Sequence, residues 1–188
     1  MTPDRSPGEW NLAVRQQEAV ARIGQLGLRT DDLEELLHDA LQVIADTLEL
    51  GDLALFEVQP DGRHVRGRAG MRLGQLVSRS RSSRLELPIG RGSLPGFVIE
   101  ERQVVASPDL LADQRFHALA PEHGVDVRAA LAAPISWDEV PWGVLVAYAA
   151  ETRVWTDDEV HFLQSIANTL GLSIQRAAVE RELRDSST

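Results

Sequence analysis

The stretch RAALAAPISWDEVPWGVLVAYAA, from Arg128 to Ala150, decides the fold of this chain. It predicts two β-strands, Arg128–Ser136 and Val140–Ala149, joined by the short polar connector WDE. The second strand is apolar on both of its alternating sides, which favours a central strand covered on both faces. Such a strand needs helices packed against it, and helical patterns lie on both of its flanks.

The two strongest helical patterns lie before and after the predicted strands. The first, Asp31–Leu50, repeats leucine, alanine and isoleucine on one face and has acidic residues near its positive N-terminal end. The second begins with a capping box, in which Thr156 is followed three residues later by Glu159. Its apolar face continues through Ile174 to Ala178. If the helix extends to Leu183, its last part projects beyond the sheet.

Four further strands are predicted between these helices from apolar alternation and turn residues. They are Asp52–Val58, Arg63–Ala69, Arg84–Ile89 and Gln103–Ser107, with a short helix ending at Glu101 before the last of them. The order predicts an α+β fold with one six-stranded, mainly antiparallel sheet. The N- and C-terminal helices would pack on one face, and the loops and the short helix on the other.

The N-terminal helix has only a thin apolar stripe, which suits a partner helix better than a globular core. We therefore expect a homodimer formed by the terminal helices, with contacts at Val20, Ile23, Leu170 and Ile174. The predicted division of the chain is 1–9 disordered, 10–28 N-terminal dimerisation helix, 29–176 globular domain, and 177–188 projecting helix end or linker.

The composition excludes several kinds of chemistry. The chain has no cysteine, so disulfides, thiolate metal sites, thiol catalysis and thioether-linked cofactors are excluded. All 19 basic residues are arginine, which excludes a Schiff-base lysine and a Walker-type lysine. A net charge of −10 argues against nucleic acid as a partner. No apolar run reaches about 18 residues, so no membrane span is expected, and without a signal-peptide pattern we expect a cytoplasmic protein.

One segment departs from the acidic balance. Gly70–Ser83 is rich in serine, glycine and arginine and predicts a loop with room for one short helical turn. Arg79, Arg81 and Arg84 form a local basic patch there. Two interpretations stand side by side: a solvated mobile loop, or an anion site.

The connection Pro108–Asp126 is long and lacks periodicity, and loops of this length are more often functional than idle. One interpretation is a lid, in which Phe116 closes an apolar pocket and Arg115 binds a ligand carboxylate or phosphate. The alternative is that Phe116 anchors the loop to the core while Arg115 pairs with Asp113.

Two histidines in this connection, His117 and His123, raise the question of a haem or metal ligand. One neutral imidazole in an apolar pocket can ligate haem iron, but the residues around His123 are polar. A metal site formed by these histidines and Asp126 is the weaker interpretation. No catalytic set is found, since Ser93 lies outside a Gly-x-Ser-x-Gly motif.

The order of the motifs resembles a GAF domain, a GAF/PAS-like sensor module of bacterial signalling proteins, over about Asp31 to Arg176. The segments that carry the resemblance are LEELLHDALQVIADTLELGDLALFEV, PIGRGSLPGFVIEERQVVASPDL, DQRFHALAPEHGVDVRAALAAPIS and PWGVLVAYAAETRVWTDDEVHFLQSIANTLGLSIQRA. That family includes cyclic-nucleotide binders, haem and bilin sensors, a methionine-sulfoxide reductase and dimerisation modules. The reductase and the cysteine-linked bilin sensors need cysteines, which this chain lacks.

The resemblance implies a non-catalytic sensor of a signal-transduction protein, such as a two-component system. It would bind an unidentified small molecule and relay a signal to an output kinase, cyclase or phosphatase. The predicted ligand-binding residues are Phe97, Arg115, Phe116, His117 and His123. No cofactor is predicted, although haem, in a gas sensor, or a non-covalent chromophore remains compatible. The alternative is a ligand-free dimerisation or protein-interaction module whose pocket is filled by its own aromatic side chains.

Overall fold

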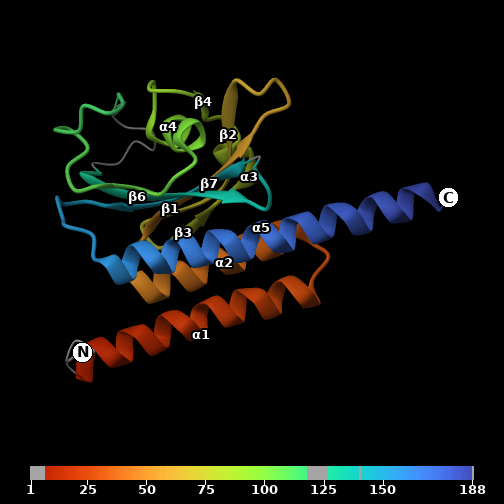
Figure 1. Ribbon diagram of the computed structural model, residues 1–188, viewed down its shortest axis with the longest axis horizontal. Helices are drawn as coiled ribbons and strands as arrows, with labels where there is room; N and C mark the ends of the chain where they lie inside the picture. The colour runs from red at the N-terminus through yellow and green to blue at the C-terminus, as the bar shows by residue number, and fades with distance from the viewer. Residues whose placement is uncertain (1–6, 118–126, 140, 188) are drawn as a thin grey trace.

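The computed structural model describes residues 7–117, 127–139 and 141–187 (Figure 1). Its helices are α1 (Pro7–Arg29), α2 (Leu33–Leu48), α3 (Arg79–Ser82), α4 (Leu94–Glu101) and α5 (Asp157–Ser186). Its strands are β1 (Asp52–Val58), β2 (His64–Arg72), β3 (Gln75–Val77), β4 (Glu86–Pro88), β5 (Val105–Ser107), β6 (Ala129–Ser136) and β7 (Pro141–Ala149).

The strands form one antiparallel sheet in the order β3-β2-β1-β7-β6-β5, and β4 also pairs with β2. Helices α2 and α5 pack on one face, α1 packs on these two helices as an outer layer, and α4 lies on the opposite face (Figure 1). The predicted α+β class, the antiparallel sheet and the terminal helices on one face are confirmed. The predicted number of six strands is wrong, because the sheet has seven.

The additional strand, β3, lies in the segment that the sequence predicts as a loop. It forms because β2 runs on to Arg72, and the two positive-φ residues Leu73 and Gly74 then turn the chain back on itself. Positive φ at both central positions is the geometry of a tight hairpin turn. The strand is short and largely exposed, so its sequence lacks the apolar alternation that marks a half-buried strand.

The hairpin of β6 and β7 lies at the centre of the sheet, as its apolar sequence predicts. Almost every residue of both strands is buried, with Leu131 and Ala147 facing α2 and α5, and Ala132 and Val146 facing α4. Helix α5 approaches closely at Gly171, where a Cβ atom would lie 2.5 Å from the carbonyl oxygen of Ser136. The sheet therefore separates two apolar cores, one on each face.

Helix α1 begins earlier in the chain than expected, whereas α5 begins where the sequence predicts. Helix α1 starts at Pro7 and so includes residues predicted to be disordered. The predicted capping box of α5 is present, since the amide of Glu159 donates to Thr156 Oγ1 and the amide of Thr156 to Glu159 Oε1. Beyond Ala177, α5 is exposed and projects from the domain (Figure 1). No helix within the described ranges is long and apolar enough to cross a membrane.

The side chains predicted to form a dimer contact are used within the single chain. Ile23 and Leu170 are fully buried and Ile174 is nearly so, all in the core that α1, α2 and α5 share with the sheet. Val20 is partly buried against the same core. The partner helices of the α1 stripe are thus the chain's own α2 and α5, and a dimer would need other side chains.

Candidate functional site

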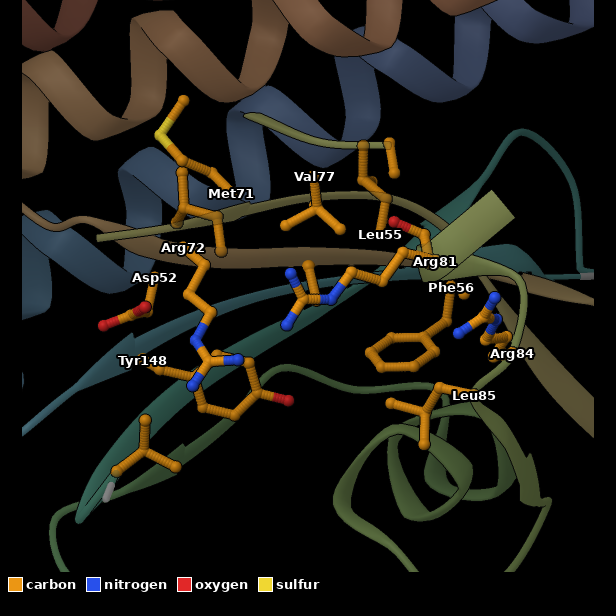
Figure 2. Close-up of a pocket in the computed structure, with 17 residues that line it drawn as sticks. Asp52, Leu55, Phe56, Met71, Arg72, Val77, Arg81, Arg84, Leu85 and Tyr148 are labelled. Atoms are coloured by element: carbon orange, nitrogen blue, oxygen red, sulfur yellow. The ribbon is translucent and has the colours of Figure 1, made fainter. Parts of the chain in front are cut away.

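A cavity of about 260 Å³ opens on the sheet face opposite α2 and α5, near the edge where β3 and β4 pair with β2 (Figure 2). Strands β1, β2 and β7 supply its floor, and the segment from β3 through α3 to β4 supplies its outer wall. The apolar residues that line it include Ala54, Phe56, Leu85, Val127 and Tyr148. The cavity is slightly smaller than the roughly 300–1,000 Å³ of typical drug-sized pockets.

Small residues leave this space open. Ala54, Gly67 and Gly70 lie where larger side chains would enter the cavity or displace its wall. At Gly67 a Cβ atom would lie 2.0 Å from the carbonyl oxygen of Ser82, the last residue of α3. The glycine therefore lets α3 rest directly on β2, because any other residue at this position would push the wall outward.

The charged residues that line the cavity are three arginines and one aspartate. Arg81 and Arg84 are exposed at its outer side, and neither side chain has an ion pair or hydrogen bond with any described residue. Arg72, in contrast, interacts with another part of the chain. The carboxylate of Asp52 accepts a hydrogen bond from the amide of Leu73 at 3.2 Å.

The basic patch identified from the sequence is divided between the two faces of the sheet. Arg81 lines the cavity, whereas Arg79 forms an ion pair of 3.2 Å with Glu34 of α2. Glu34 also pairs with Arg68 of β2, which in turn lies 3.3 Å from Glu57. Burial raises the pKa of Glu57 and lowers that of Arg68, because each charged form loses water. The cavity wall is thereby tied to the helical layer.

The residues predicted to bind a ligand gather elsewhere, around α4 and the loop after β5. Phe97 and Phe116 are both buried, with ring centroids 5.6 Å apart. Arg115 donates to Asp113 Oδ2 at 2.6 Å and to the carbonyl oxygen of Ala106 at 2.9 Å. The hydrogen bond that Arg115 donates to Asp113 is the main cause that lowers the pKa of Asp113 to about 2. The geometry is that of the alternative in which Phe116 anchors the loop.

The two histidines do not form a site in the described part of the chain. His117 is exposed, and its amide donates to the carbonyl oxygen of Arg91 at 2.8 Å. His123 lies outside the described residues. No histidine is among the described residues that line the cavity, and none of Phe97, Arg115, Phe116 and His117 lines it either. That these residues contact a ligand stays a prediction. Within the described ranges, no cluster of histidine and carboxylate residues could hold a metal ion.

Sequence patterns signalled only part of the cavity. The arginine patch pointed to Arg81 and Arg84, with an anion site as one of its two interpretations. Nothing in the local sequence marked Phe56, Arg72 or Tyr148, because these residues meet only when β1, β2 and β7 pair.

Comparisons with known proteins give a family and a fold. A family model described as GAF domain matches residues 32–174. An uncharacterized protein of Picosynechococcus sp. is 43% identical over 51 residues, which is 27% of this chain and 32% of that protein. The chain thus spans about a third of the length of this curated relative.

Several solved structures share the fold. The GAF domain of a phosphoenolpyruvate-protein phosphotransferase from Coxiella burnetii is 22% identical, with a TM-score of 0.78 over 90% of this chain and 98% of that one. The corresponding domain from Acinetobacter is 19% identical, with a TM-score of 0.74 over 87% and 95% of the two chains. Free methionine-R-sulfoxide reductase from Neisseria meningitidis, solved with its substrate, is 16% identical, with a TM-score of 0.72 over 94% and 96%. At these identities the likeness is one of fold.

Proposed function

Because this chain belongs to the GAF domain family, we propose that it is a non-catalytic sensor domain of a bacterial signal-transduction protein, and that it binds a small molecule in the cavity beneath α3. Family and fold support a sensor or regulatory module. The observation that carries the ligand proposal is the cavity itself, which has an apolar floor and a few converging polar groups. This combination is typical of small-molecule sites.

A non-catalytic role is supported by the chemistry that the cavity contains. The chain has no cysteine, so the thiol chemistry open to other proteins is absent here. No histidine or glutamate is among the described residues of the cavity. Its one carboxylate, on Asp52, is held by a backbone amide. The described residues therefore provide no pair of groups suited to nucleophilic or acid–base catalysis.

The route by which a signal would leave the domain runs from the cavity wall to the helices. Helix α3 contributes Arg81 to the cavity and Arg79 to the ion pair with Glu34 of α2. Helix α2 packs against α1 and α5, and Arg184 of α5 lies 3.2 Å from Asp31, just before α2. A displaced α3 would thus act on the terminal helices, and through them on an output kinase, cyclase or phosphatase domain.

Ligand binding is testable by thermal unfolding in the presence of a library of small metabolites. The wild-type chain is compared with a variant in which a larger side chain fills the cavity. A compound present at 100 times its dissociation constant adds about 2.7 kcal/mol to the free energy of unfolding. We expect at least one such compound, and loss of its effect in Ala54→Leu. The matched control is Ala178→Leu, at an exposed position on α5. Stabilisation that persists in Ala54→Leu would contradict binding in this cavity.

A second candidate is the ligand-free interaction module. The observation in its favour is that Phe97 and Phe116 fill the space beside α4 with the protein's own side chains. A thermal screen in which no compound raises the unfolding temperature would favour this candidate over the sensor.

In either case we propose a homodimer through the outer faces of α1 and α5. Large apolar side chains are exposed there, at Val14, Leu28, Leu172, Val179 and Leu183. A specific interface needs roughly 1,000 Å² of buried surface, and two long helices can supply this area. We expect a dimer by light scattering, and a monomer with unchanged circular dichroism for Leu172→Arg combined with Leu183→Arg. A wild-type chain that stays monomeric at high concentration would contradict the dimer.

A further inference from the structure

We propose that the ligand of this cavity is a small organic anion, whose carboxylate or phosphate group is held by Arg81 and Arg84 while its apolar part lies on Phe56 and Tyr148. This inference rests on the proposed small-molecule function and narrows it to a chemical class. Three observations support it: the charge of the residues that line the cavity, the guanidinium groups at its outer wall that are unpaired within the described chain, and its volume.

The charge of the cavity is opposite to that of the chain. Three arginines and one aspartate line it, which gives a formal charge of +2 (three minus one), in a chain whose net charge is −10. Cations gathered around one cavity repel each other unless an anion lies between them. A concave site lined by one sign of charge also raises the local concentration of ligands of the other sign.

Arg81 and Arg84, at the outer wall, have N–H donors that are available to a ligand. Most other arginines near this edge of the sheet are paired: Arg66 with Glu86, Arg68 with Glu34 and Glu57, and Arg79 with Glu34. Arg81 and Arg84 lack such a partner among the described residues. A guanidinium presents five N–H donors in a planar fork that matches the geometry of carboxylate and phosphate oxygens.

The side chains are also directed suitably. In Figure 2, Arg72 extends into the cavity from β2 and Arg81 extends into it from α3, and the rings of Phe56 and Tyr148 lie beneath them. Asp52 lies at the edge of the cavity rather than between the arginines, and its carboxylate is held by the amide of Leu73. The one fixed negative charge therefore leaves the donors of Arg81 available.

The size of the cavity limits the anion. At about 260 Å³ it is smaller than the roughly 300–1,000 Å³ of typical drug-sized sites. A nucleic acid strand or a haem is too large to be enclosed there, whereas a carboxylic acid or phosphate ester with one small apolar group would fit. Ala54 and Leu85 complete an apolar surface for such a group beside the two rings.

The test uses benzoate, benzamide and benzamidine, which have nearly equal shape and different charge, together with phenyl phosphate as a second anion. Binding to the full chain is measured by calorimetry and by the shifts of the arginine Nε–H resonances in NMR spectra. We expect phenyl phosphate, benzoate or both to bind, and the neutral and cationic probes to bind at least about tenfold more weakly, since a hydrogen bond to a charged group contributes about that factor or more. The two anionic probes show whether a phosphate or a carboxylate is preferred.

Variants assign the binding to the cavity. Arg81→Gln and Arg84→Gln should each weaken binding of the anionic probe by about tenfold to a hundredfold. The matched control Arg63→Gln removes the same charge from an exposed position outside the cavity, and should leave the affinity within about twofold, because exposed distant charges are screened by salt. Equal affinity of the wild type and Arg81→Gln for the anion would overturn the proposal.

Two results separate this inference from the proposed function. If benzamide or benzamidine binds as tightly as the anions and Ala54→Leu abolishes that binding, the cavity is a ligand site but not an anion site. The sensor function then stands, and the anion proposal is overturned. If no probe binds at millimolar concentration and the metabolite screen is also silent, both are overturned.

Discussion

The sheet face opposite α2 and α5 has a filled end and an open end. At the filled end, beside α4, two phenylalanine rings pack together, and the loop after β5 is fixed by the Asp113–Arg115 ion pair. At the open end, small residues of β1 and β2 face a wall that carries exposed arginines, and a cavity remains. Both ends belong to the same sheet and face the same side. The difference teaches that side-chain volume and charge, rather than the fold, decide where this domain has space for a ligand.

The largest expected effect comes from opening the filled end. Phe97→Ala removes a buried ring, which typically costs about 3–5 kcal/mol in the free energy of unfolding, through lost burial and the cavity left behind. Urea unfolding measures this loss. The control Leu111→Ala, at a side chain that is 67% exposed, should change the free energy by less than about 0.5 kcal/mol. Similar values for the two variants would mean that the filled end is not packed as described.

The next effect concerns the contact that forms the open end. Gly67→Ala places a methyl group against the carbonyl oxygen of Ser82, and such overpacking costs about 1–3 kcal/mol. The matched control is Gly24→Ala in α1, whose Cβ atom would meet Thr169 at an ordinary 3.7 Å. This control should stabilise the chain by about 0.5–1 kcal/mol, because alanine is the better helix former. If thermal unfolding shows that both substitutions stabilise the chain, or that both destabilise it, the close contact at Gly67 is contradicted.

A smaller effect concerns the ion pair of the filled end. Arg115 holds the pKa of Asp113 at about 2, below its ordinary value of 3.8. The pair therefore stabilises the fold fully above about pH 4 and loses this contribution as the pH falls toward 2. Asp113→Asn should cost about 1 kcal/mol at neutral pH, a modest value because Arg115 is half exposed and its charge is screened.

Unfolding at several pH values checks this prediction, since the difference between wild type and Asp113→Asn should shrink as the pH falls from about 4 toward 2. The control Asp138→Asn removes a charge at an exposed position. It should give no pH-dependent difference beyond about 0.5 kcal/mol. A difference between wild type and Asp113→Asn that grows on acidification would contradict the described ion pair.

The smallest effect on stability is expected at the open end. Arg81→Gln should change the free energy of unfolding by less than about 0.5 kcal/mol, because its side chain is exposed and unpaired within the described chain. Arg79→Gln, two residues earlier, loses its ion pair with Glu34 and should cost up to about 1 kcal/mol. If Arg81→Gln is the more destabilising of the two in urea, Arg81 has a structural role and the two ends differ less than the geometry indicates.

The sequence predicts the parts of this fold that local patterns encode. The central hairpin, the amphipathic α2 and the capping box of α5 each follow from the spacing of a few residues, and each is present. Strand β3 was missed because three largely exposed residues carry no such pattern. The thin stripe of α1 predicts a partner helix but not its source, since periodicity shows that a face is apolar but not which helix covers it.

The candidate site was harder to predict for a physical reason. A cavity is space left between segments that are distant in sequence, here β1, β2, β7 and α3. The arginine patch was visible from composition, but the direction of each side chain depends on how a single helical turn lies across the edge of the sheet. The aromatic residues drew attention to the loop after β5, where they pack against each other instead.

The outer wall of the cavity is held at both ends, because β3 before it and β4 after it each pair with the same strand, β2. A segment held in this way cannot swing outward like a lid without breaking sheet hydrogen bonds. We therefore expect a ligand to enter and leave through rotations of exposed side chains, which take picoseconds to nanoseconds, rather than through loop opening on the microsecond to millisecond scale. The domain would then report the momentary concentration of its ligand and store no memory of earlier exposure.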